Sequence, residues 1–298
     1  MLNTDDPSTR RVTENGDNSM YKRLIAASLI VLFALVSPAG AITNGQPDQD
    51  NQFPYVGMVT FYNATWNYLW RCSGALLSPT VFLTAGHCTA PDPPDVPVHA
   101  KVWLNWDLAK LTYPYEYPNA TYPNVCGPYP DKCWTGTPYH HPNYASPYAH
   151  GLPGFITHDV GVVVLDSSGV PVGTLGQYAD LPDEGVVDTL PMRTTVMVVG
   201  YGVQHRIRGA PPNPWAGLRM RYFAPSSLIQ SNDVISDEFM KLTANPAQGK
   251  GGTCLGDSGG PDLLGGTRTV LAVTSFGTNY NCAGVGYYYR IDTADGLD

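Results

Sequence analysis

The chain has few charged residues and no long helical repeat. Only 14% of its 298 residues are charged, whereas soluble domains average about 25%. With 31 Gly, 27 Pro and 19 Tyr, this composition excludes coiled coils and long-helix bundles, which need Ala, Glu, Lys and Leu at helical spacing. The 17 basic residues against 25 acidic ones give a net charge of −8, so we expect no nucleic-acid partner. The 43% apolar content argues against a disordered chain.

No apolar run reaches the roughly 20 residues of a membrane-spanning helix. The longest, residues 24–36, follows Lys22 and Arg23 and precedes the small residues 37–41. A basic stretch, a short apolar run and an Ala-x-Ala ending are typical of a secretory signal peptide. We therefore expect residues 1–41 to be a polar n-region and a signal peptide. The mature protein would be secreted and extracellular, without stable membrane association; a membrane anchor is the alternative.

Export changes how the six cysteines are interpreted. In an oxidising compartment an even count predicts disulfides, but arithmetic alone leaves every pairing open. A metal site would have to join Cys126 and Cys133 to His140 and His141, a spacing that fits none of the usual zinc patterns. These histidines lie among Pro, Tyr and Asn, so we expect solvated loop residues there. The sequence thus predicts no metal and no cofactor.

From residue 42 onward the sequence predicts an all-β fold. Short β-rich runs alternate with Gly, Pro, Asn and Asp, which is typical of a barrel or a sandwich. Residues 111–155, dense in Tyr and Pro, are expected to form one long surface loop, either a rigid decoration or a rim that contacts substrate. The expected strands are Tyr55–Tyr62, Cys72–Leu77, Val81–Thr84, Val160–Leu165, Thr194–Val199, Leu218–Phe223, Thr269–Ser275 and Val285–Ile291.

Three short segments carry residue types suited to nucleophilic catalysis. Ser258 lies between glycines on a predicted tight turn, where the N–H groups of Gly256 and Ser258 can hold an oxyanion. His87 follows an apolar run, and Asp159 opens another, a poor place for a charge unless it is paired. His87 can take the proton of the Ser258 hydroxyl, and Asp159 can fix the imidazole tautomer and stabilise the imidazolium.

The order His87, Asp159, Ser258 with these flanking sequences resembles the chymotrypsin/trypsin family of serine endopeptidases, over most of residues 42–291. The resemblance implies an all-β fold of two antiparallel six-stranded barrels, with the active site in the cleft between them. The protease domain would be residues 42–298, with a first barrel at about 42–165 and a second at about 166–298. A monomer that cleaves protein or peptide substrates is expected. Further matches are Ser73-Gly74-Ala75-Leu76, Gly200-Tyr201-Gly202 and Ser275-Phe276-Gly277.

The resemblance also implies disulfide pairs and a specificity pocket. The family pairs are Cys72–Cys88 and Cys254–Cys282, whereas Cys126 and Cys133 have no counterpart and are expected to pair with each other. The pocket residues would be Gly252 at the base, with Thr253, Ser275, Gly277 and Gly286. Because Gly252 replaces the aspartate of trypsin-like members, the pocket is expected to be open and uncharged. It would prefer an apolar or aromatic residue before the scissile bond.

Ile42 resembles the mature N-terminus of the family, a β-branched residue followed shortly by glycine. In that family the freed amine pairs with the aspartate before the nucleophile, here Asp257, and the pair orders the oxyanion loop. Ala41 directly precedes Ile42, so signal peptidase alone would create the active terminus. Cleavage after Ala39, which leaves two extra residues, is the alternative.

Two other functions compete with the endopeptidase. One is a catalytically silent binding protein on the same fold, which the loss of a triad residue would favour, but no triad residue is lost. The other is an esterase-type hydrolase, because the same triad cleaves esters. The α/β-hydrolases need alternating strands and helices and the chain order Ser, Asp, His, and this sequence has neither.

Overall fold

The computed structural model describes residues 42–108, 132–145, 156–166, 169–203, 205–206, 215–216, 219–231, 237–245, 248–278 and 282–297. All of them belong to one unit of the chain, Ala39–Asp298. The predicted signal peptide and Cys126 lie outside the described residues. No helix within these ranges combines the length and the apolar character needed to span a bilayer.

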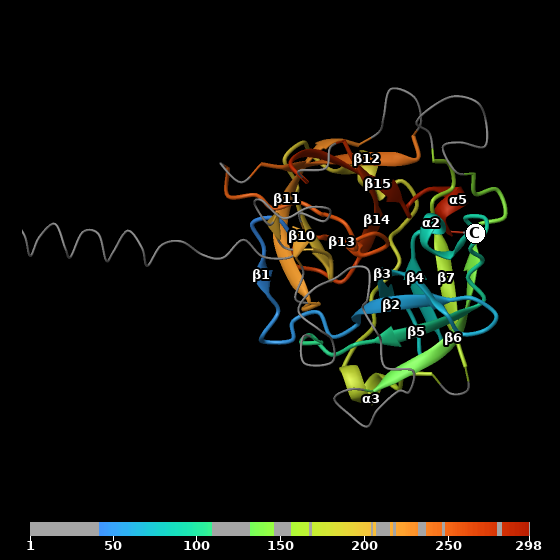
Figure 1. Ribbon diagram of the computed structural model, residues 1–298. Helices are drawn as coiled ribbons and strands as arrows, with labels where there is room; N and C mark the ends of the chain where they lie inside the picture. The colour runs from blue at the N-terminus through green and yellow to red at the C-terminus, as the bar shows by residue number, and fades with distance from the viewer. Residues whose placement is uncertain are drawn as a thin grey trace, which may run out of the picture. The chain divides into compact units, whose positions relative to one another are not determined.

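Six antiparallel strands close a first barrel in the order β2-β3-β4-β7-β6-β5 (Figure 1). All seven residues of β2 are buried; its first residues face the second half of the chain, and Trp66, Tyr68 and Lys101 cover Tyr62 at its end. The strands are β2 (Val56–Tyr62), β3 (Tyr68–Leu76), β4 (Val81–Thr84), β5 (His99–Trp103), β6 (Cys133–His140) and β7 (Gly161–Leu165).

A second barrel repeats the same topology, in the order β8-β11-β12-β15-β14-β13, and closes through pairing of β8 with β11. The short β1 (Gln46–Pro47) extends this sheet by pairing with β11. Two closed six-stranded barrels confirm the predicted all-β fold class. The strands are β8 (Thr195–Gly200), β11 (Tyr222–Gln230), β12 (Phe239–Ala244), β13 (Pro261–Leu264), β14 (Val270–Gly277) and β15 (Gly284–Arg290).

The helices of the described residues are single turns. One of them, α2 (Gly86–Thr89), lies beside β7 (Figure 1), and another, α5 (Ala294–Leu297), contacts the segment before β7 through Asp295 and His158. A two-stranded ribbon pairs β9 (His205–Arg206) with β10 (Trp215–Ala216). The remaining turns are α3 (Val172–Leu175) and α4 (Val186–Thr189).

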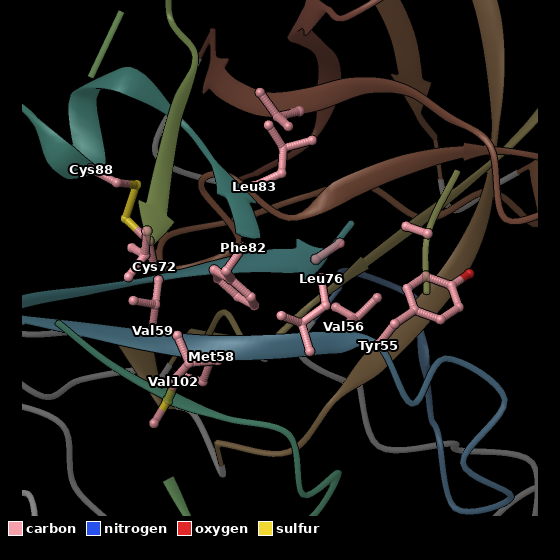
Figure 2. Packing of buried hydrophobic residues seen from close by; sticks show 14 of the residues in the cluster. Tyr55, Val56, Met58, Val59, Cys72, Leu76, Phe82, Leu83, Cys88 and Val102 are labelled. Atoms are coloured by element: carbon pink, nitrogen blue, oxygen red, sulfur yellow. A yellow bond between two sulfur atoms is a disulfide. The ribbon is translucent and has the colours of Figure 1, made fainter. Parts of the chain in front are cut away.

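One hydrophobic cluster extends from the first barrel into the second. Figure 2 shows Phe82 in the middle of the first-barrel part of this cluster, with Val56 on one side and Val59 on the other, beside the Cys72–Cys88 disulfide. The same cluster includes buried side chains of the second barrel, among them Val199, Phe223, Leu263 and Tyr289. Each such side chain stabilises the fold by about 1.5–3 kcal/mol. The residues between the barrels are therefore held on a continuous core.

Arg221 adds a polar link between the barrels. This side chain is fully buried just before β11, and its Nε donates to Asp48 Oδ2 at 2.7 Å. Its Nη1 donates to the carbonyl of Val56 on β2 at 2.8 Å. Because a buried charge is stable only when paired and hydrogen-bonded, these contacts fix the approach of the two barrels.

The interpretation of residues 111–155 as one long loop is wrong. Residues Cys133–His140 form β6, which pairs with both β5 and β7. From Gly136 to Tyr139 the strand alternates buried and exposed positions, as a half-buried strand must. Pro138 and the neighbouring aromatic residues hid this alternation, because proline within a run argues against a strand. The rest of the stretch lies largely outside the described residues.

Candidate active site

A single helical turn presents His87 at the end of β4. The chain leaves β4 at Thr84, and α2 begins at Gly86. The next residue, Cys88, forms a disulfide with Cys72 on β3, as the resemblance implied. The turn is thus fastened on both sides of His87, and the imidazole stays partly exposed, with 26% of the side chain accessible.

Asp159 lies just before β7 and is completely buried. Its carboxylate accepts the backbone N–H of His87 at 2.7 Å, and Nδ1 of the same residue lies 3.0 and 3.1 Å from the two oxygens. The hydroxyl of Ser275 on β14 donates to Oδ2. An ionised carboxylate only accepts hydrogen bonds, so Nδ1 carries the proton and Nε2 is left as an acceptor.

In the His87–Asp159 pair, the attraction between the two side chains shifts both pKa values more than burial does. Burial alone would lower the pKa of His87, but the charge and hydrogen bond of Asp159 raise it above its ordinary 6.5. Burial would likewise raise the pKa of Asp159, yet the pKa is lowered by His87 and by the Ser275 hydroxyl. The arrangement therefore stabilises a protonated imidazole beside an ionised carboxylate.

The loop that carries Ser258 is fastened to the first barrel. Ser73 on β3 donates its N–H to the Ser258 carbonyl at 2.8 Å, and its hydroxyl donates to the Gly256 carbonyl at 2.9 Å. Gly259, the residue after Ser258, packs so closely on Thr84 that no β-carbon would fit. Since Thr84 ends the strand that leads to His87, these contacts place the serine and histidine segments side by side.

The backbone of this loop exposes two N–H groups. Gly256 has a φ of 92°, a left-handed conformation that residues with a β-carbon rarely adopt. Within the part of the chain that the structure describes, the N–H groups of Gly256 and Ser258 have no acceptor, and both residues are partly exposed. Asp257 between them is buried, and its carboxylate accepts the N–H groups of Gly202 and Cys254 at 2.7 and 2.9 Å.

Two of the predicted pocket residues, Thr253 and Gly286, meet at the hydroxyl of Tyr288. Thr253 Oγ1 lies 3.2 Å from this oxygen, and the same oxygen occupies the space beside Gly286. Gly277 has open space beside it. Gly252 does not open a space of its own, because Ala244 fills the position that its β-carbon would take. Tyr288 and Ala244 therefore complete this group, and no sequence motif predicted either of them.

The hydroxyl of Ser275 donates to the Asp159 carboxylate, a contact that the sequence did not predict. Its predicted place among the pocket residues stays a prediction. The contact joins β14 of the second barrel to the segment before β7 of the first. A motif within one segment cannot reveal such a contact, because it depends on how the two barrels meet.

The segment that begins at Ile42 packs onto the second barrel. Ile42 is completely buried in the second-barrel core. Thr43 forms an antiparallel bridge with Gly252, with N–H to carbonyl distances of 2.8 and 3.2 Å. The predicted N-terminal segment therefore lies directly against the predicted base of the pocket. The second family disulfide, Cys254–Cys282, closes beside it.

The remaining cysteine pair stays a prediction. Cys133 is disulfide-bonded, but its predicted partner Cys126 lies outside the described residues. Among the histidines of this region, His140 is exposed as expected, whereas His141 is partly buried against Asp295. The expectation of solvated loop histidines is therefore wrong for His141.

Comparisons with known proteins identify the class and the family. The Trypsin family matches residues 42–108 and 135–295. The cercarial protease of Schistosoma mansoni is 27% identical over 248 residues, covering 79% of this chain and 80% of the relative. The chain is a serine endopeptidase of the chymotrypsin fold, and it belongs to the trypsin family.

Solved structures share the same fold at low sequence identity. Human heparin binding protein matches with a TM-score of 0.58 and 19% identity, covering 85% of this chain and 93% of that one. The structure titled HL collagenase matches with a TM-score of 0.55 and 16% identity, covering 83% and 92%. At this identity the likeness supports the barrel architecture alone, and the chemistry must be argued from the residues of this chain.

Proposed function

We propose that this endopeptidase cuts peptide bonds through Ser258, His87 and Asp159. The Ser258 hydroxyl attacks the scissile carbonyl carbon while Nε2 of His87 takes its proton. His87 then gives that proton to the departing amine, and the acyl group stays on Ser258 until water, activated by the same imidazole, hydrolyses it. The observation that carries the proposal is the buried Asp159, which fixes Nδ1 of His87 as a donor.

The N–H groups of Gly256 and Ser258 complete the mechanism. As the carbonyl becomes tetrahedral, negative charge develops on its oxygen, and two fixed donors stabilise it without reorganisation. The left-handed Gly256 and the contacts of Ser73 support this role, because they hold the loop in one conformation before substrate arrives.

Replacement of either reacting side chain tests this mechanism. Ser258→Ala and His87→Ala should each lower kcat by roughly 10⁴- to 10⁶-fold on a cleavable peptide. Both side chains are partly exposed, so the melting temperature should change little. His140→Ala, in an exposed histidine, is the matched control and should keep full activity. Near-normal turnover in Ser258→Ala would refute the mechanism.

The pH profile provides a second, independent test. A protonated His87 cannot accept the serine proton, so kcat/KM should fall as the pH drops through the pKa of His87. Because that pKa is raised, the midpoint should lie above pH 6.5. Asp159→Asn should lower kcat by about 10⁴-fold and move the midpoint to lower pH. A midpoint that stays unchanged in Asp159→Asn would contradict the assigned pair.

For specificity we propose a preference for apolar or aromatic residues before the scissile bond. Thr253, Gly277 and Gly286 bring no charge. Burial raises the pKa of Asp262 near Tyr288 and favours its neutral form, so an arginine entering there would lose its hydration without an ionised partner. A peptide library should therefore be cut faster after Phe, Tyr, Leu or Met than after Arg or Lys. A profile dominated by Arg and Lys would overturn this preference.

Finally, we propose that the protein is secreted in active form. Removal of residues 1–41 would free the amine of Ile42 to pair with Asp257, and the buried position of Ile42 beside the second barrel supports this. Sequencing the N-terminus of freshly secreted protein should give Ile42 on active molecules. An inactive species that begins at Gly40 would refute the proposal. Asp257→Asn should abolish activity while leaving the His87–Asp159 contact in place.

A further inference from the structure

A second polar cluster, formed by His141, His158, Tyr289 and Asp295, lies next to the segment that carries Asp159. Asp295 of α5 accepts the Tyr289 hydroxyl and Nδ1–H of His158 through the same oxygen, each at 2.6 Å. Nε2 of His141 lies 3.6 Å from its other oxygen. His158 immediately precedes Asp159, so the carboxylate of α5 is bonded to the neighbour of the proposed triad aspartate.

The donor set of this cluster suits a metal ion, but the geometry does not. The ligand atoms of His141, His158 and Asp295 lie within 4.8 Å of one another. The two imidazoles stack face to face, however, with centroids 4.9 Å apart and planes 13° from parallel. A metal must lie near the plane of each ring that binds it, and two stacked, nearly parallel rings do not direct their nitrogens toward one shared point. Nδ1 of His141 also accepts the N–H of Asn143 at 3.2 Å, so in the neutral ring Nε2 carries the proton.

The backbone at His158 is strained. Its φ of 52° lies in the left-handed region, which is unfavourable for a residue with a β-carbon. The carbonyl of His158 accepts the N–H of Val160 at 2.8 Å, which closes a tight turn around Asp159. Strained conformations persist only where surrounding contacts hold them. Here the contacts are Asp295 on the imidazole and Glu238 on the backbone N–H, the latter at 3.4 Å.

The same turn lies against the residue before His87. A β-carbon on Gly86 would come within 3.0 Å of the Val160 nitrogen and 3.1 Å of the His158 carbonyl oxygen. A shift of the turn therefore moves Asp159 relative to His87 as well as relative to Ser275. Since misplacement of a catalytic group by about 1 Å can cost roughly 100-fold in rate, the strained turn needs a firm anchor.

We propose that His158 and Asp295 are positioning residues. Their contact forms a clamp through which α5 holds the Asp159 carboxylate in hydrogen-bonding position for His87. The proposal rests on the function proposed above and deepens it. Tyr289 orients the Asp295 carboxylate by occupying one of its lone pairs, and His141 packs on the face of the His158 ring. The clamp touches neither substrate nor the reacting atoms, so it acts on kcat only through Asp159.

Kinetics of three variants test the clamp. Asp295→Ala and His158→Ala should each lower kcat by roughly 10- to 100-fold with little change in KM. His158→Gly should recover part of the loss relative to His158→Ala, because glycine adopts the left-handed conformation without strain. His140→Ala, in the exposed neighbour of His141, is the control and should behave as the parent chain.

A readout that does not need activity separates positioning from mere stability. In the Ser258→Ala chain, NMR titration of His87 should show its pKa lowered by Asp295→Ala, because the contact with Asp159 is weakened. A lower melting temperature with an unchanged His87 pKa and kcat would overturn the clamp. One equivalent of Zn²⁺ bound by the Ser258→Ala chain and lost with His141→Ala would also overturn it, in favour of a metal centre.

The titration also keeps the two proposals distinguishable. If the parent chain cuts no peptide while Asp295→Ala still lowers the pKa of His87, the proposed function fails and the clamp stands. If peptides are cut and Asp295→Ala changes neither kcat nor the titration, the clamp fails and the proposed function stands.

Discussion

Replacing Asp262 with asparagine should stabilise the protein. Asp262 lies on β13, four residues beyond Ser258, and is completely buried. Its Oδ2 has no hydrogen-bond partner among the described residues, and Oδ1 has only the Thr274 hydroxyl at 3.4 Å. Burial, reinforced by the nearby charge of Asp257, raises its pKa well above the ordinary value. Asparagine has nearly the same shape and cannot ionise.

The sign and size of the effect follow from proton binding. Above about pH 4 the unfolded chain releases the Asp262 proton, whereas the folded chain keeps it because the folded pKa is raised. The contribution of Asp262 to stability is therefore fully present below pH 4. It is lost at about 1.4 kcal/mol per pH unit until the pH reaches the folded pKa. At pH 7 Asp262→Asn should therefore be the more stable chain, by about 1.4 kcal/mol for each pH unit between pH 4 and the folded pKa of Asp262.

Urea unfolding at pH 4, 5.5 and 7 measures this effect. The experiment uses the Ser258→Ala chain, so that self-digestion does not interfere, and keeps the disulfides oxidised. The advantage of Asp262→Asn should be small at pH 4 and should grow with pH. Asp50→Asn, in an exposed carboxylate, is the control and should show little change. A parent chain that is more stable than Asp262→Asn at pH 7, or a difference independent of pH, would refute the reasoning.

Three further predictions concern packing around the site and the buried link between the barrels. Gly86→Ala should lower kcat by roughly 10- to 100-fold at unchanged KM, because the added methyl group pushes against the turn around the proposed triad aspartate. Asp48→Ala should cost about 3–5 kcal/mol in urea unfolding, because it leaves Arg221 buried without its partner; a loss below about 1 kcal/mol would contradict the buried pair. Replacing Cys72 and Cys88 together by serine should cost about 3 kcal/mol in the same assay, and unchanged stability would show that the disulfide adds nothing.

The strands predicted most closely are those whose residues are apolar in the sequence and buried in the fold. The limits of β4 match the expected Val81–Thr84, because this run is apolar and bounded by turn residues. By contrast, β5 was not predicted. It contains Lys101, a buried lysine whose ammonium lies over the rings of Tyr62 and Trp66 at 4.9 and 5.2 Å. A charge held by aromatic rings from another segment hides the strand pattern until the fold is known.

The site residues divide in the same way, into those that a local motif identifies and those that only the fold brings together. Local motifs marked His87 and Ser258, because each lies in a short segment with its own turn and flanking residues. The contact between Ser275 and Asp159 was not predictable, since it joins strands of different barrels across 116 positions of sequence. The role of Asp295 was hidden for the same reason, as only the fold brings α5 beside the turn at His158.

One measurement tests the central claim most directly, the labelling of Ser258 by a fluorophosphonate probe. Protein that begins at Ile42 is treated with the probe, and the modified peptide is located by mass spectrometry. The account predicts one equivalent of label on Ser258, lost in His87→Ala because the hydroxyl then has no base to take its proton. Peptide cleavage without any label, or a label on a residue other than Ser258, would contradict it.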